Sequence, residues 1–98
     1  GRNMQVKTKS GFEWDISARL DDARLVDAIA LAESEEESDK LIAYRELKKF
    51  LLGKDGTEAL YEHIKGMTGE DYVPIQTLRE EITEIFVALG DEDKEIKN

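Results

Sequence analysis

The 98-residue sequence contains no cysteine, one histidine and one proline. Without cysteine the chain has no disulfide framework, no thiolate nucleophile and no cysteine-based zinc site. No apolar run approaches the roughly 20 residues that a membrane-spanning helix needs, and no signal-peptide pattern is present. We therefore expect a protein of the cytoplasm with no membrane partner.

Basic residues are also scarce, because 23 acidic side chains stand against 14 basic ones and leave a formal net charge of −9. Surfaces that bind nucleic acid by neutralising phosphates need clustered Lys and Arg, so the charge argues against nucleic acid as a partner. The length suits one small domain, which buries too little surface for deep pockets. A binding protein is therefore favoured over an enzyme.

The start of the chain alternates apolar and polar residues, which predicts a β-hairpin over residues 4–17. Residues 1–3 precede Met4 and are interpreted as a remnant of an expression vector. A two-residue loop would place apolar residues on both faces, whereas a three-residue loop over residues 9–11 keeps them on one. Such a loop needs Gly11 in the left-handed conformation. The preferred register pairs Met4 with Ile16, Val6 with Trp14, and Lys7 with Glu13.

The remaining sequence has helical periodicity, so the predicted fold class is mainly α (α+β), with the hairpin followed by a compact four-helix domain. Asp21 or Asp22 is expected to cap the first helix and Ser38 or Asp39 the second. A turn is expected over residues 54–56, between the second helix and the third. The predicted boundaries are 21–33, 38–52, 57–66 and 74–89 for the helices, 4–90 for the single domain and 91–98 for an acidic flexible tail.

Glycines and apolar stripes complete this prediction. Gly53 and Gly90 stand where the second and fourth helices should end. On the first helix the apolar residues that share one face, and are expected to be buried, are Leu25, Val26, Ile29 and Ala32.

Candidates for catalysis are few. His63 is the only histidine, and we interpret it as a partly exposed structural residue. Glu80, Glu81 and Glu84 are expected on the solvent face of the fourth helix, with no nucleophile or glycine-rich loop beside them. We therefore predict no catalytic residue, no metal site and no cofactor.

Several apolar residues lie outside the expected core stripes. On the second helix the apolar set covers about half the circumference, which is more than a core-facing helix needs. Ile42 lies between Glu46 and Lys49 on that helix, and Leu31 lies among Arg24 and Asp27 on the first. Such outliers favour a partner-binding or self-association surface. The residues predicted to contribute to it are Leu31, Ile42, Tyr44, Leu51 and Val87.

Five segments follow one another in a recognisable order: GFEWDI at 11–16, LDDARL at 20–25, KKFLLG at 48–53, EALYEHI at 58–64, and a proline-led helix that ends in EIFVALG at 84–90. In this order and spacing the chain resembles the tail assembly chaperones of long-tailed bacteriophages of Gram-positive hosts. The resemblance spans residues 4–90. Its motifs are packing and turn motifs, so it transfers no individual binding residue.

The resemblance implies a non-enzymatic protein that coats the tape measure protein in the cytoplasm of the bacterial host and is absent from the mature virion. It also implies a longer, frameshifted form that recruits the tail tube protein, and association between copies is possible. A long amphipathic helix aggregates unless its apolar stripe is covered, and a helical domain with an apolar groove can cover it.

Two other classes remain open on the sequence alone. An acidic phage protein of this size could inhibit a host nucleic-acid-binding protein by presenting carboxylates where phosphates would sit. An enzyme would require a concave pocket that gathers His63 with two carboxylates.

Overall fold

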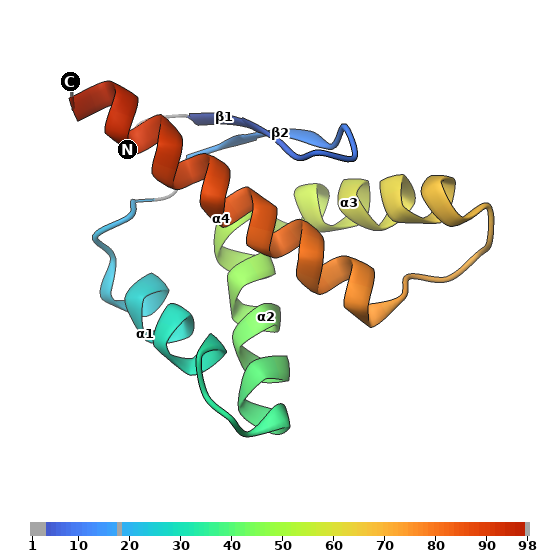
Figure 1. Cartoon of the computed structure of the whole chain (residues 1–98), viewed down its shortest axis with the longest axis horizontal. Coiled ribbons are helices and arrows are strands. Elements are labelled where there is room, and N and C mark those ends of the chain that lie inside the picture. Colours follow the sequence, from blue (N-terminus) through green and yellow to red (C-terminus); the bar gives the residue numbers. More distant parts are fainter. Residues whose placement is uncertain (1–3, 18, 98) are drawn as a thin grey trace.

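The computed structural model describes residues 4–17 and 19–97, with side chains as far as residue 90. The interpretation of residues 1–3 as a vector remnant lies outside the described residues. An antiparallel hairpin precedes four helices (Figure 1), which confirms the predicted fold class. The elements are β1 (Met4–Lys7), β2 (Glu13–Ile16), α1 (Ala23–Ala32), α2 (Glu37–Leu51), α3 (Gly53–Thr68) and α4 (Ile75–Lys97).

The hairpin has the predicted register. Met4 pairs with Ile16 and Val6 with Trp14, so the apolar side chains share one face. The Gly11 amide donates to the Thr8 carbonyl at 3.0 Å, and Gly11 has a φ of +97°. This confirms the three-residue loop with a left-handed glycine.

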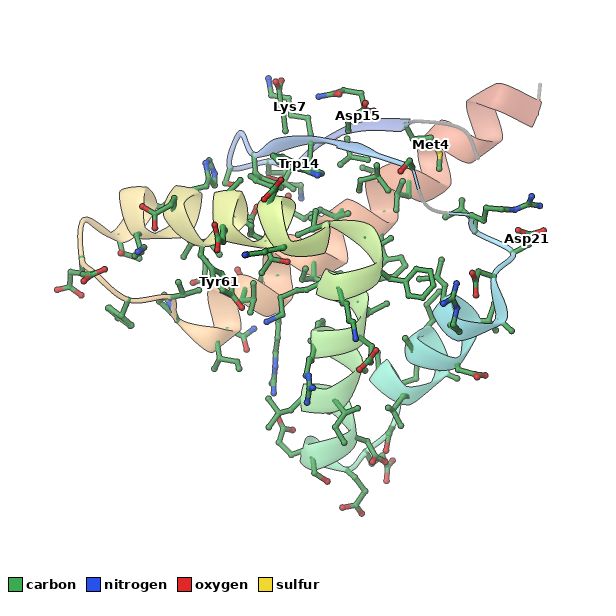
Figure 2. All side chains as sticks on the ribbon, turned by 180° about the vertical axis from the view of Figure 1, so that it is seen from behind. Met4, Lys7, Trp14, Asp15, Asp21 and Tyr61 are labelled. Carbon is green, nitrogen blue, oxygen red and sulfur yellow. The ribbon has the colours of Figure 1, made fainter. Side chains whose placement is uncertain are left out.

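The core lies where the hairpin meets α3 and α4. A two-stranded hairpin is marginal in water on its own, and here its apolar face packs against α4 while Trp14 lies over the start of α3 (Figures 1 and 2). Each strand and each helix contributes at least one of the largest fully buried side chains, so α1 and α2 also reach the core. These residues are Val6, Ile16, Leu25, Leu47, Leu60, Ile64, Ile82, Ile85 and Leu89.

Two predicted helix boundaries are wrong. Residues 54–56 form the first turn of α3 rather than a connecting turn, because Gly53 alone, with a φ of +68°, redirects the chain from α2 into α3. Gly90 does not end α4, which continues to Lys97, so the predicted tail is helical through that residue. A glycine inside a helix costs about 1 kcal/mol relative to alanine, which lowers its stability without stopping it.

The N-cap of α1 is as predicted from the sequence, whereas that of α2 is not. Asp22 caps α1, and its Oδ1 accepts from the Arg24 amide at 2.9 Å. The N-cap of α2 is Glu36, so the prediction of Ser38 or Asp39 is wrong. Asp39, in the first turn of α2, instead accepts a hydrogen bond at 2.8 Å from Oγ of Ser34 in the connection.

The predicted apolar stripe of α1 is wrong at two of its four positions, while Ala32 is half-buried and packs against the core as predicted. Leu25 and Ala28 are buried, whereas Val26 is 52% exposed and Ile29 is 36% exposed. The physical reason is that α1 packs chiefly on α2, so only the narrow face toward that one neighbour is covered. Two large apolar residues are left facing outward.

Candidate protein-binding site

A surface groove of about 580 Å³ runs between α1 and α2. The two helices are joined by a four-residue connection, which sets them side by side as a helical hairpin (Figure 1). Apolar atoms of three side chains and charged groups of four line the groove. These lining residues are Arg24, Asp27, Ala28, Leu31, Glu46, Lys49 and Phe50.

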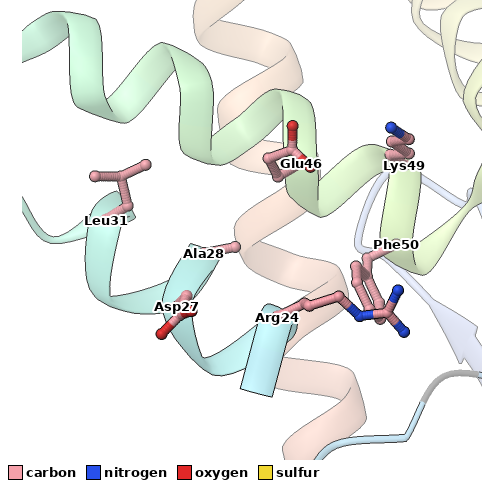
Figure 3. Close-up of a pocket in the computed structure, with 7 residues that line it drawn as sticks. All are labelled: Arg24, Asp27, Ala28, Leu31, Glu46, Lys49 and Phe50. Carbon is pink, nitrogen blue, oxygen red and sulfur yellow. The ribbon is translucent and has the colours of Figure 1, made fainter. Parts of the chain in front are cut away.

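The lining residues are ordered along the groove (Figure 3). Leu31 lies at one end, while Arg24, Lys49 and Phe50 lie toward the other, with Asp27 and Glu46 in between. Along α1 these positions follow at steps of three and four residues, so each lies about one helical turn from the next.

Arg24 is held at its end of the groove by two contacts. Its guanidinium carbon lies 4.8 Å from the centroid of the Phe50 ring, and its Nη2 donates to Asp22 Oδ2 at 2.9 Å. Hydrogen bonding and charge from Asp22 raise the pKa of Arg24, and the Arg24 guanidinium lowers the pKa of Asp22. Both groups therefore stay charged at neutral pH.

The other three charged residues of the groove have no such partner among the described side chains. Within the part of the chain that the structure describes, Asp27, Glu46 and Lys49 take part in no ion pair. Their charges are available to a ligand in the groove.

The structure places one of the five predicted surface residues, Leu31, in the lining of this groove, and a second, Ile42, outside the lining on the adjoining face of α2. Leu31 is half-buried in its lining. Ile42 is 49% exposed and precedes Glu46 by one turn of α2, so it continues the same face of that helix. Val87 is 60% exposed but belongs to α4, outside the lining.

The remaining two predicted residues belong to the interior side of α2. Leu51 is only 4% exposed and part of the core, so its assignment to a surface is wrong. The chain turns back at Gly53 directly after α2, which buries the last turn of that helix. Tyr44 is half-buried and packs against the core, with the Arg79 guanidinium carbon 5.8 Å from its ring centroid.

The sequence did not predict the exposure of several other apolar residues. Helical periodicity shows which apolar residues share a face, but it does not show which of them a neighbouring element covers. The missed residues are Val26, Ile29, Leu41, Met67, Tyr72 and Ile75.

A polar cluster joins the hairpin loop to α3 and α4. Glu81 is only 3% exposed, so the prediction that it faces solvent is wrong. Its Oε1 accepts from Thr8 Oγ1 at 2.8 Å and from Ser10 Oγ at 3.0 Å. Ser10 Oγ also lies 2.9 Å from His63 Nε2, and Glu84 accepts from the Lys9 amide at 2.6 Å.

The cluster ties the hairpin loop to two helices. The Glu81 carboxyl group accepts from both hydroxyls, while the donor between Ser10 Oγ and His63 Nε2 depends on the tautomer of the histidine ring. These contacts hold the loop against α3 and α4.

Neither a metal centre nor a membrane span is found in the described residues. No group of three or more metal-ligating side chains lies together among them. None of the helices, over the residues described, combines the length and apolar character needed to cross a bilayer. Comparison of the chain with protein-family models, curated proteins and solved structures gave no match.

Proposed function

We propose that this chain is a non-catalytic tail assembly chaperone of a long-tailed bacteriophage, which binds and solubilises the tape measure protein during tail morphogenesis. It acts in the cytoplasm of the bacterial host and leaves before the virion is mature. The resemblance of residues 4–90 to that family supplies the class of function. The observation that carries the proposal is the groove between α1 and α2, with Leu31 in its lining and Ile42 beside it.

The groove suits a helical partner. An amphipathic helix docks by laying its apolar side chains into such a groove, in contact with residues spaced by three and four. Each contact of this size is weak, but many copies along one long helix act together. The net charge of −9 keeps the coated complex apart from other complexes and in solution.

Further partners follow from the same proposal. Copies side by side on one helix contact each other, and Val87 on α4, outside the groove, is our candidate for that contact. A longer, frameshifted form recruits the tail tube protein.

Co-expression with the tape measure protein encoded downstream tests the proposal. Purification through a tag on the tape measure protein, followed by light scattering, should give a soluble complex that holds many copies of this chain. An insoluble tape measure protein with this chain left free and monomeric would contradict the proposal, and would direct attention to acidic inhibition of a host nucleic-acid-binding protein.

Neighbouring residues on α2 provide a matched pair of variants. Ile42 and Leu41 are 49% and 45% exposed, but successive helical residues point about 100° apart, and only Ile42 continues the groove face. Ile42→Lys should be retained on the tape measure protein in smaller amounts than wild type, with an unchanged melting temperature. Leu41→Lys should be retained as well as wild type. Equal retention of the two variants would show that the tape measure protein does not bind at the groove.

A further inference from the structure

Like charges from both helices line the groove. Arg24 of α1 and Lys49 of α2 lie toward one end, and Asp27 and Glu46 lie in the middle (Figure 3). The spacing of the α1 residues is repeated in reverse on α2, where Lys49, Glu46 and Ile42 are separated by three and four residues. The groove therefore presents a basic, an acidic and an aliphatic zone, one helical turn apart.

The acidic zone carries the strongest uncompensated charge. The Arg24 charge is shared with Asp22 through a 2.9 Å ion pair, so the basic zone offers chiefly Lys49. The carboxylates of Asp27 and Glu46 have no ion-pair partner among the described side chains. A ligand that leaves both carboxylates unpaired while it excludes water loses affinity.

We propose that the groove selects an amphipathic helix by its charge order. The bound helix places an apolar side chain on Leu31, a Lys or Arg one turn further between Asp27 and Glu46, and an acidic residue one turn beyond, beside Lys49. This inference rests on the proposed function in taking a helix of the tape measure protein as the natural occupant. It adds that only segments with this order bind, in one direction along the groove.

Two synthetic peptides test the charge order directly. Both are 18-residue alanine-based helices in which every leucine precedes the charged residues, so that reversing the direction of the bound peptide does not restore the other charge order. In the first, Lys follows a leucine by four residues and Glu follows it by seven, and in the second Lys and Glu are exchanged. The wild-type chain should bind the first peptide about tenfold more tightly in low salt, since each exposed charge pair contributes modestly and two pairs change sign.

Charge reversal in the chain should reverse this preference. Asp27→Lys/Glu46→Lys should favour the second peptide, and the difference should shrink in high salt. The matched control is Glu58→Lys/Glu70→Lys, which changes two exposed carboxylates outside the groove lining that take part in no ion pair among the described residues, and it should keep the wild-type preference. Asp27→Asn/Glu46→Gln, which adds no new charge, should lose the preference.

The outcomes separate this inference from the proposed function. Equal affinity for both peptides, binding of neither, or a dimer of the chain that Asp27→Lys/Glu46→Lys abolishes would overturn the charge-order inference. Retention of wild type and Asp27→Lys/Glu46→Lys alike on the tape measure protein would also overturn it, yet leave the chaperone proposal standing. The expected peptide preference without retention of wild type would support the charge order and overturn the chaperone proposal.

Discussion

The Glu81 carboxylate lies within 3.0 Å of two hydroxyl groups from the hairpin loop, 71 and 73 residues away in sequence. Glu84, one turn further along α4, accepts a hydrogen bond from the Lys9 amide of the same loop. These contacts hold the loop against α4, and the Ser10–His63 contact holds it against α3. A polar cluster of this kind is stabilising only while each buried group keeps its partner.

Removal of the Glu81 carboxylate should therefore be costly. We expect Glu81→Ala to lower the free energy of unfolding by about 2–3 kcal/mol, because the hydrogen bonds from Thr8 and Ser10 to the buried carboxyl group are both lost. Urea unfolding measures this loss. Glu80→Ala, at an exposed position one residue earlier, should stay within about 0.5 kcal/mol of wild type, and a similar loss in both variants would contradict the role given to Glu81.

Gly56 and Gly66 test another residue-scale feature, the close approach of α3 to the hairpin. A Cβ on Gly56 would lie 2.8 Å from Trp14 Nε1 and 2.8 Å from Leu52 Cβ, whereas a Cβ on Gly66 would meet nothing within 4 Å. Gly56→Ala should destabilise by about 1–3 kcal/mol through overpacking. Gly66→Ala should stabilise by about 0.5–1 kcal/mol through helix propensity. Melting temperatures that shift in the same direction would contradict this difference.

At the scale of elements, α1 differs from the other helices in how it is held. It buries Leu25 and Ala28 and packs chiefly on α2, while α3 and α4 meet the hairpin and each other in the core. Helices with few buried apolar contacts open locally at a smaller free energy than the whole protein. One wall of the groove is thus a helix that buries two side chains and is held chiefly by one neighbour.

Hydrogen exchange should resolve this difference. We expect amides of α1 to exchange well before those of α3 under native conditions, and Leu25→Ala to widen the gap because it removes the main anchor of α1. Binding of a helical partner in the groove should slow exchange in α1. Uniform protection across α1 and α3 would show instead that the helices open together.

At the scale of the whole molecule, salt bridges to carboxylates make stability depend on pH. A hydrogen bond and charge from Arg79 lower the pKa of Glu37 and link α2 to α4. Arg19 lowers the pKa of Asp21 in the same way. Since the folded state holds these pKa values below their unfolded values, this stabilisation is present above the ordinary carboxyl pKa of about 4 and is lost as the pH falls through the folded values.

The urea concentration at the unfolding midpoint should therefore decrease as the pH is lowered from 6 to 3. The midpoint of Glu37→Gln should decrease less steeply than that of wild type, because this variant lacks one carboxyl group with a lowered pKa. The difference should be small, since the pair lies at the surface. Glu58→Gln, at an exposed position with no ion pair among the described residues, should keep the wild-type slope. A Glu37→Gln slope equal to or steeper than wild type would contradict the role of the Arg79 pair.

Local features of the molecule could be predicted from the sequence. The hairpin register follows from a two-residue alternation and one glycine, and a slip by one residue would turn every apolar side chain to the wrong face. The helices follow from periodicity, and the Asp22 cap acts only on its own first turn. The charged neighbours of Leu31 and Ile42 were also visible, because residues three and four apart share a helix face.

Burial and assembly of the site could not be predicted in the same way, because they depend on which elements meet. Leu51 is buried because α3 starts directly after it, and Glu81 because the hairpin loop packs on that face of α4. Val26 is exposed because no described neighbour covers that side of α1. By itself, the sequence determined the elements, the strand register and the charges beside each apolar outlier, since these depend on neighbours along the chain. Only the tertiary structure decided that α1 and α2 set those charges into one ordered groove, because contact between distant residues depends on how whole elements pack.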